Sequence, residues 1–593
     1  MPKKREIDEI TGKAIEAKVF RRLLPYLRPH LLGVFTAIGV LLITVGIALY
    51  TPRLLGQIVD EALVPRNREL LIRLAMIFVG LELLWTAAKV FEGYLLQSIG
   101  QDVMQKLRMD LFGRLMRMPM RFYDRNPTGR LVTRVSNDTA NLMEIFGAGF
   151  VTLIADILVV TGVLVAMLFL DWRLGLVAVS MFPVMALAMN HFSKRLRVSY
   201  REARSSLSFM NSFFAERMGG MPTVQLMNME AHERKRFDAL SEDYFVKQMG
   251  SVNVFAFFHP SITMLTALSI ALTLYFGGGY VIDKSVPIGV FVSFLAYVQV
   301  LFQPVRGLTE KYNIYQNAMS SAERIFGALD LQEEDGLREI STASGKAPRL
   351  SGAIHFDHVW FSYAESSVPW ALRDANFKIS PQERIAVVGH SGAGKSTLLS
   401  LLFRFYQPQK GTILLDEKPI ESYGKHFLRR RLGFVQQDVF IFAGTIRENL
   451  ALLGENISEE RMIAACKSTG MDRIVARLDA GFETKLDERG SNLSLGERQV
   501  LAITRVLLQD PDILILDEAT SHVDNATERM LQRAIGEVTK NRTSILIAHR
   551  LSTIRDANRI FVFENGALVE SGTHESLLAQ NGAYRAFSSS QSL

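Results

Sequence analysis

Cysteine is almost absent from this sequence, because Cys466 is the only one among 593 residues. An intramolecular disulfide is therefore impossible, and neither an oxidising compartment nor a structural zinc site is indicated. The first long apolar run begins only after about residue 30, and no cleavage site of small residues follows the basic start, so we expect no removable signal peptide. Acidic residues do not balance the basic ones, and the formal charge of +7 favours an anionic partner, either nucleic acid or a membrane surface.

Long apolar runs fill the first half of the chain. Hydrophobic residues make up 48% of the sequence, which is high for a soluble enzyme. Six runs approach or exceed the roughly 20 residues that cross a bilayer, so we expect six transmembrane helices. They lie near Leu31–Tyr50, Leu71–Tyr94, Ile145–Leu170, Leu174–Met189, Val254–Ile282 and Ile288–Phe302. The alternative, buried helices of a large soluble domain, accounts poorly for several runs that contain no charge.

Lysine and arginine crowd the segments between the second and third runs and between the fourth and fifth runs. The loops on the opposite side are short, such as Asp171-Trp172-Arg173. This asymmetry favours a membrane over nucleic acid as the anionic partner, and it predicts that the long segments and both termini are cytoplasmic. The expected location is the inner (plasma) membrane, with an amphipathic stretch, Val19 to Leu27, along its inner surface.

The basic segments have the pattern of helices that continue out of the membrane. Residues 95–120 contain few helix breakers, and as one helix they would extend roughly 40 Å. Pro119 and the turn Asn126-Pro127-Thr128-Gly129 then interrupt the helix, and Gly219-Gly220-Met221-Pro222 interrupts the second segment. We therefore expect two helical hairpins with sharp tips, which suit contacts to a soluble domain.

Composition changes after about residue 330. A polar linker follows, and from Leu350 short β-branched runs alternate with helical stretches, an α/β pattern. The predicted organisation is an N-terminal cytoplasmic segment over 1–30, a six-helix transmembrane domain over 31–330, a linker over 331–349 and an α/β domain over 350–593.

A phosphate-binding loop stands near the start of the α/β domain. Residues 389–396 spell Gly-His-Ser-Gly-Ala-Gly-Lys-Ser, between a strand-like run and a helix-like run. The glycines allow backbone N–H groups to surround phosphates, Lys395 supplies charge to the terminal phosphates, and the Ser396 hydroxyl is a ligand for Mg²⁺. The residues expected to bind the triphosphate are Gly389, His390, Ser391, Gly392, Ala393, Gly394, Lys395, Ser396 and Thr397.

Polar groups follow two further strand-like runs. The run Ile513 to Leu516 is followed by Asp517 and Glu518. Asp517 is placed to hold Mg²⁺ through water, and Glu518 to polarise the attacking water. His549 ends another run, where we expect it to contact the γ-phosphate or the water rather than to fill the core.

The segment Leu493-Ser494-Leu495-Gly496-Glu497-Arg498-Gln499 resembles the signature sequence of ATP-binding-cassette (ABC) proteins. Together with the six spans, nearly the whole chain resembles a half-size ABC exporter, as far as Gly572-Thr573-His574-Glu575. The resemblance implies an α-helical membrane domain, with six transmembrane helices and long cytoplasmic extensions, followed by an α/β P-loop ATPase domain. It also implies ATP and Mg²⁺ as cofactors.

The resemblance adds further site residues. Tyr363 matches the aromatic residue that stacks on adenine, while Ser494 and Gly496 supply a hydroxyl and a close amide. Gln437 matches the glutamine that touches Mg²⁺ or water and senses the membrane domain, with Gln436 as the alternative. Loops and coupling segments of the family are matched by Asp487–Gly490, Ser521–Asp524, Met118–Asp124 and Glu216–Gly220.

A second half-transporter subunit is the expected partner. In this family two nucleotide domains pair head to tail, and one chain carries a single set of motifs. Leu495 and Glu497 stand where the family usually has glycine and glutamine, while the hydrolytic residues are intact. Subunits of heterodimers often show this division, so we favour a separately encoded partner over a homodimer.

The expected function is ATP-driven export of amphiphilic small molecules, either drugs or lipids, across the inner membrane. The spans are rich in Phe, Met and Leu, which fits such substrates without separating the two classes. The alternatives are a lipid flippase homodimer, a soluble cassette ATPase of DNA repair or translation, and a non-pumping regulatory subunit or gated channel. Six spans argue against the soluble ATPase and against a nucleic-acid partner, and the intact Glu518 and His549 argue against a subunit that does not pump.

Overall fold

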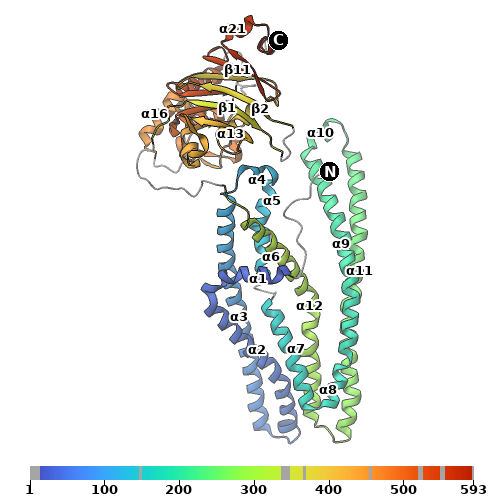
Figure 1. The fold of residues 1–593 in the computed structure, drawn as a ribbon. Coiled ribbons are helices and arrows are strands. Elements are labelled where there is room, and N and C mark those ends of the chain that lie inside the picture. The colour runs from blue at the N-terminus through green and yellow to red at the C-terminus, as the bar shows by residue number, and fades with distance from the viewer. Residues whose placement is uncertain are drawn as a thin grey trace. The chain divides into compact units, whose positions relative to one another are not determined.

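The computed structural model divides the chain into two compact units. The helical unit comprises Met1–Met116 and Thr128–Leu331, and the α/β unit comprises Arg117–Pro127 and Gln332–Leu593. The residues described are 14–145, 150–334, 348–364, 369–452, 457–517, 525–547 and 554–590. An α-helical part followed by an α/β part is the predicted fold class, which is thereby confirmed (Figure 1).

Helices of 6 to 53 residues make up the described part of the helical unit. They are α1 Ala14–Leu27, α2 Leu31–Gln57, α3 Arg68–Leu115, α5 Thr128–Thr133, α6 Thr139–Glu144, α7 Phe150–Leu170, α8 Trp172–Val179, α9 Met181–Gly219, α10 Met221–Leu226, α11 Glu230–Ile282 and α12 Ile288–Leu329. Among the described residues, five helical stretches are long and apolar enough to cross a membrane: Arg21–Leu63, Arg68–Leu115, Val151–Leu170, Trp172–Gly219 and Glu230–Ile282. A shorter apolar helix, Ile288–Pro304, covers the sixth predicted run, so the count of six spans stays a prediction.

Two glycines allow α2 and α12 to pack very closely. A Cβ atom on Gly56 would overlap the carbonyl group of Gly289, and one on Gly289 would overlap that of Gly56. The Gly289 N–H donates to Asp60 at 2.6 Å, and the Tyr297 hydroxyl donates to the Leu49 carbonyl at 2.7 Å. Small residues at a crossing increase dispersion contacts, and polar groups add interhelical bonds, where lipid supplies no hydrophobic driving force between helices.

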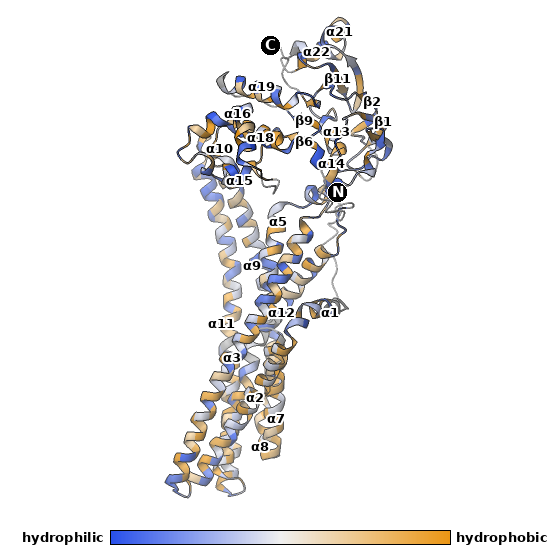
Figure 2. Cartoon of the chain, turned by 90° about the vertical axis from the view of Figure 1, so that its left-hand side faces the viewer, coloured by the Kyte–Doolittle hydropathy of each residue, from blue (hydrophilic) through white to orange (hydrophobic). Residues whose placement is uncertain are grey.

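The predicted hairpin breaks are present, with differences in detail. α9 ends at Gly219 and α10 begins at Met221, as the second break predicts. α3 ends at Leu115, short of the predicted residue 120, because Pro119 forces the chain into an extended conformation before the next helix. The fourth run divides between α8 and α9 at Ser180. In Figure 2 hydrophobic colouring gathers along α2, α7 and α8, and hydrophilic colouring near the α10 end of α9 and α11.

Three sheets organise the described residues of the α/β unit. A six-stranded sheet has the order β12-β11-β3-β10-β9-β6, and all its neighbours are parallel except β11 and β12. A four-stranded antiparallel sheet has the order β2-β1-β4-β5, and β7 pairs with β8. The strands are β1 Ile354–Phe361, β2 Leu372–Ile379, β3 Arg384–Val388, β4 Lys410–Leu415, β5 Lys418–Pro419, β6 Leu432–Val435, β7 Gly444–Thr445, β8 Lys485–Leu486, β9 Ile513–Asp517, β10 Thr543–Ile547, β11 Arg559–Glu564 and β12 Ala567–Gly572.

Helices of the α/β unit surround these sheets. They are α4 Met120–Arg125, α13 Lys395–Leu402, α14 Lys425–Arg431, α15 Ile446–Leu450, α16 Glu459–Thr469, α17 Met471–Ala476, α18 Leu495–Gln509, α19 Asn525–Thr539, α21 His574–Ala579 and α22 Ala583–Ser590. α4 comes from the first half of the sequence, yet it belongs to this unit.

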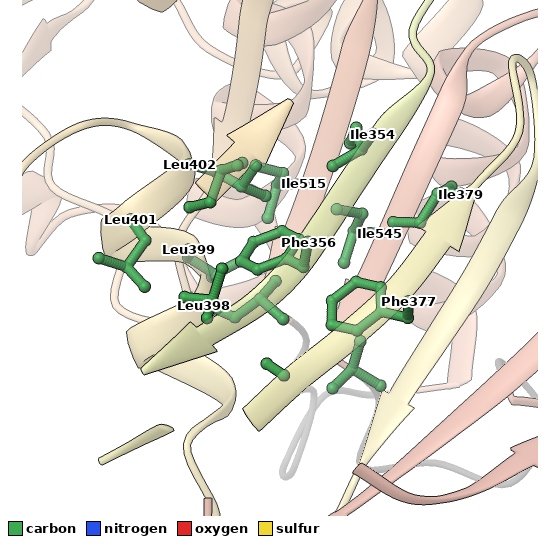
Figure 3. Packing of buried hydrophobic residues seen from close by; sticks show 14 of the residues in the cluster. Ile354, Phe356, Phe377, Ile379, Leu398, Leu399, Leu401, Leu402, Ile515 and Ile545 are labelled. Carbon is green, nitrogen blue, oxygen red and sulfur yellow. The ribbon is translucent and has the colours of Figure 1, made fainter. Parts of the chain in front are cut away.

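The main core of the α/β unit lies where α13 and the two large sheets meet. Phe356 and Phe377 stack with ring centroids 4.7 Å apart, and Ile515 and Ile545 of the parallel sheet are fully buried against the same cluster (Figure 3). Burying each such side chain contributes roughly 1.5–3 kcal/mol. This packing fixes α13, and with it the end of the phosphate-binding loop, against the sheets.

Candidate functional site

The phosphate-binding loop joins β3 to α13 and has the backbone that the sequence predicts. Gly392 and Gly394 have φ values of 81° and 101°, a region that side chains disfavour. A Cβ atom on Gly394 would lie 2.7 Å from the carbonyl oxygen of Ala371, so a larger residue does not fit. His390, Ser391, Gly392 and Ser396 are exposed, whereas Ala393 and Gly394 are buried. The loop therefore presents an open outer side and the free N–H groups of the first turn of α13, which suits an anion.

Lys395 folds back over this loop. Its Nζ donates to the carbonyl oxygens of Gly389 at 2.7 Å and His390 at 3.0 Å, and its side chain is buried. Burial lowers the pKa of Lys395, and the charge of Asp517 partly opposes that effect. The ammonium group is thus held beside the loop by two neutral carbonyl groups, which a phosphate can replace.

Four strand ends meet at one edge of the parallel sheet. β3, β10, β9 and β6 are consecutive neighbours, and the register pairs Ile547 with Asp517 and Val435 with Leu516. Because parallel strands end at the same edge, the phosphate loop, Asp517 and the Gln436–Gln437 segment lie on that edge. Gln437 is exposed. Glu518 directly follows β9 in sequence, and His549 comes two residues after the end of β10, but both lie outside the described residues, as does Ser521–Asp524.

Tyr363 lies beside the phosphate loop, just after β1. Its hydroxyl is 3.4 Å from the Thr397 hydroxyl in α13, and 46% of its surface is exposed. Its ring meets Phe361 and Tyr406 edge to face, with centroids 4.8 and 5.0 Å away. These contacts fix the plane of the Tyr363 ring while leaving surface free for a planar base.

The signature segment begins helix α18. Ser494 is the N-cap residue, and its side chain accepts from the Glu497 N–H at 3.3 Å, while Glu497 accepts from the Ser494 N–H at 2.9 Å. This capping box explains the spacing of the two residues. Arg477, which follows α17, donates to the Glu497 carboxylate. Gly496 is buried and Leu495 is partly exposed. Sequence reasoning did not identify Arg477, although the S-x-x-E pattern of the capping box was visible.

A pocket of about 250 Å³ opens next to the Gln436–Gln437 segment. Its lining is mostly apolar and includes Phe440, Leu452 and Val506, together with Gln436 and Arg505. Burial lowers the pKa of Arg505 to about 10, and its guanidinium donates to the carbonyl oxygens of Phe440 and Asn449 at 2.7 Å each. Sequence reasoning did not find this pocket, since its lining comes from segments far apart in the chain.

The residues after α12 form a buried ion cluster within the α/β unit. The Glu334 carboxylate accepts from Lys425 Nζ at 3.0 Å and from Arg429 at 2.6 and 3.0 Å. The Glu334 N–H donates to the Arg117 carbonyl at 2.8 Å, and Arg117 Nε lies 3.1 Å from the Glu333 carboxylate. The beginning of the predicted linker is therefore fixed to α14 and to the segment that contains α4.

Comparisons with known proteins identify relatives of both units. The ABC transporter transmembrane region family matches residues 34–305, and the ABC transporter family matches residues 372–521. The chain is 36% identical over 579 residues to the uncharacterized ABC transporter ATP-binding protein YknV of Bacillus subtilis, covering 97% of this chain and 95% of that protein. It is 33% identical over 566 residues to an ATP-dependent lipid A-core flippase of Syntrophus aciditrophicus, covering 95% and 93%. It is 34% identical over 494 residues to the probable multidrug resistance ABC transporter ATP-binding/permease protein YheH of Bacillus subtilis, covering 83% and 72%.

Proposed function

The chain belongs to the ABC transporter family, and we propose that it is one subunit of a dimeric exporter that moves amphiphilic lipids or drugs across the inner membrane. ATP hydrolysis is coupled to transport, and the chain is a multi-pass membrane protein. The observation that carries the proposal is the union, in one chain, of apolar helices with a phosphate-binding loop and a capped signature helix. We propose domain limits of 31–330 and 350–593, with the nucleotide domain and both termini in the cytoplasm, since basic residues crowd the segments on that side.

The proposed ATP site uses residues from the edge of the parallel sheet. Lys395 and the loop amides hold the phosphates, and Tyr363 stacks on adenine. The hydroxyl of Ser396, the amide of Gln437 and the carboxylate of Asp517, the last through water, are oxygen donors of the kind that Mg²⁺ prefers. When bound, Mg²⁺ would neutralise charge on the phosphates.

Hydrolysis in this proposal depends on Glu518, which would accept a proton from the attacking water, and on His549, which would contact the γ-phosphate. Glu518 directly follows β9, and His549 comes two residues after the end of β10. These strands follow β3, the strand that leads into the phosphate loop, in the order β3-β10-β9 of the parallel sheet. Gln437 lies on the same edge and would report the state of the site to the membrane helices.

Pairing with a second half-transporter would complete the site. The Ser494 hydroxyl and the Gly496 amide, at the N-terminus of α18, suit the γ-phosphate of ATP held by the partner. The pocket beside Gln436 suits the hairpin tip of the partner chain. Support comes from α10 and its flanks, where Leu226 is 82% and Met227 66% exposed, an apolar surface that water disfavours.

The substrate class is tested with the purified chain in lipid vesicles. We expect ATP-dependent movement of a fluorescent lipid or an amphiphilic dye, and stimulation of ATPase activity by the transported compound. The matched control is Lys395→Ala, which removes the phosphate-binding charge and leaves the membrane helices intact. Transport that is equal in the control would contradict ATP-driven export.

The partner is tested by expressing this chain alone. We propose a separately encoded partner, because leucine at position 495 adds bulk where phosphate approaches the signature helix. A purified dimer of this chain alone whose ATPase activity is stimulated by a drug or lipid would instead establish the homodimer.

A further inference from the structure

A continuous set of contacts joins the proposed adenine site to α4, which lies within the segment that resembles a coupling segment. Tyr406 lies between α13 and β4 and is half-buried. Its ring contacts Tyr363 edge to face at 5.0 Å, and its hydroxyl donates to the carboxylate of Asp124 in α4. All three residues belong to the α/β unit.

The Tyr406 ring is held from a second side. Phe361, at the end of β1, packs against it with centroids 5.5 Å apart, and Phe361 also contacts Tyr363 at 4.8 Å. The three rings therefore form one cluster, in which a shift of the Tyr363 ring alters its contact with Tyr406. Because Phe361 is buried in the core, the cluster has a fixed side and an exposed side.

The hydroxyl of Tyr406 can act only as a donor toward Asp124. Burial raises the pKa of Tyr406 well above its ordinary value, and the hydrogen bond to Asp124 raises it further. A protonated phenol that donates to a carboxylate forms a charge-assisted hydrogen bond, which is stronger than a neutral one. Asp124 is exposed, and its bond to Tyr406 ties α4 to the ring cluster.

We propose that Tyr406 is a positioning residue that links occupancy of the adenine site to the position of α4. The inference rests on the proposed function, since it takes Tyr363 as the adenine-stacking residue. A base stacked on Tyr363 fixes that ring, the ring fixes Tyr406, and the Tyr406 hydroxyl fixes Asp124. Nucleotide binding then reaches α4 through Tyr406, separately from the Gln437 segment.

The test measures the environment of α4 in the full-length chain in nanodiscs. Met120, the first residue of α4, is replaced by cysteine in Met120→Cys and labelled with an environment-sensitive fluorophore; its exposed fraction is 42%. The native Cys466 is buried and its pKa is raised to about 12, so it does not compete for the label. Binding of ATP is measured without hydrolysis, so the result does not depend on the partner subunit.

Tyr406→Phe keeps the ring and removes the hydroxyl. We expect its Kd for ATP to stay within about twofold of the parent, while the fluorescence response of α4 to ATP falls severalfold. Asp124→Asn should reproduce this loss, and the double variant should lose no more than either single one. Tyr406→Leu also removes the ring contact, so its Kd for ATP should rise about two- to tenfold.

Tyr423→Phe is the matched control, because the Tyr423 hydroxyl donates to the Leu415 carbonyl at 2.9 Å and not to α4. Tyr423→Phe should leave both the Kd for ATP and the fluorescence response of α4 unchanged. If ATP changes the fluorescence of α4 in both Tyr406→Phe and Asp124→Asn as much as in the parent, the inference is wrong, while the proposed function is unaffected. Failure of the labelled parent chain to bind millimolar ATP would instead overturn the proposed function.

Discussion

The buried carboxylate of Glu334 offers the sharpest test of how the chain between the two units is held. The Glu334 and Lys425 side chains are each 7% exposed, so Glu334→Gln leaves the Lys425 charge buried without its counter-ion. Breaking one partner of a buried ion pair costs roughly 3–5 kcal/mol. Glutamine still accepts one hydrogen bond, and Arg429 is 26% exposed and can turn toward water. We therefore expect Glu334→Gln to lower the free energy of unfolding by about 3 kcal/mol. For a domain of roughly 250 residues, this lowers the unfolding midpoint by roughly 6–12 °C.

A double-variant cycle separates the ion pair from general damage to the fold. The full-length chain in nanodiscs, with Trp85→Phe and Trp172→Phe in every variant, is heated, and unfolding of the α/β unit is followed by the fluorescence of Trp360 and Trp370. Lys425→Met combined with Glu334→Gln removes both charges, so the double variant should be more stable than Glu334→Gln alone. Glu483→Gln is the control, because its partner Arg447 is 38% exposed and the pair contributes less than about 1 kcal/mol. If the loss of stability in the double variant equals the sum of the losses in the two single variants, the stability does not come from the Glu334–Lys425 ion pair.

The same cluster predicts a pH dependence. Burial raises the pKa of Glu334, but the hydrogen bonds and charges of Arg429 and Lys425 outweigh it, so the pKa lies below 4.5. A group whose pKa is lowered by folding stabilises the folded state above its unfolded pKa and loses that contribution as pH falls through the folded value. The stability difference between the parent and Glu334→Gln should thus be constant from neutral pH to about pH 5 and shrink in more acidic buffer.

Three further outcomes test the proposed ATP site. Lys395→Ala should raise the Kd for ATP about tenfold or more in a fluorescent-nucleotide assay, and unchanged affinity would count against the loop assignment. Glu518→Gln should bind ATP but hydrolyse it about 100-fold more slowly in a phosphate-release assay, and near-normal turnover would remove Glu518 from its role. Arg477→Ala should raise the KM for ATP at low salt and less at high salt, with recovery when Glu497→Gln is added. If Glu497→Gln does not restore the KM, the unpaired charge of Glu497 is not the reason for the increase.

Local sequence patterns predicted the phosphate loop and the hairpin breaks. The spacing of Gly389, Gly392 and Gly394 requires positive φ values, which the structure has, and Pro119 marks a break in the helix. These features depend on residues a few positions apart. The end of α3 was misplaced because residues 95–120 contain no proline before Pro119, and the effect of proline extends to the residues that precede it.

Non-local features could not be predicted in the same way. The order β3-β10-β9-β6 brings Asp517 beside the phosphate loop, although more than a hundred residues separate β3 and β9 in sequence. Glu334 lies in a run of acidic residues that is typical of a solvated linker, and its cationic partners become visible only in the folded unit. Tyr406 likewise carries no local signal, because its partner Asp124 belongs to the first half of the chain.

The two unusual residues of the signature have different physical consequences. Glu497 is the third residue of α18, where glutamic acid and glutamine serve a capping box equally well, so the substitution changes charge but not shape. Arg477 donates to that carboxylate and offsets the added charge near the helix end that we propose to receive phosphate. Leu495 is the first residue of α18 and is partly exposed, so it adds bulk at the surface of the helix end. Our proposal of a separately encoded partner therefore rests on position 495, because Arg477 already offsets the charge of Glu497.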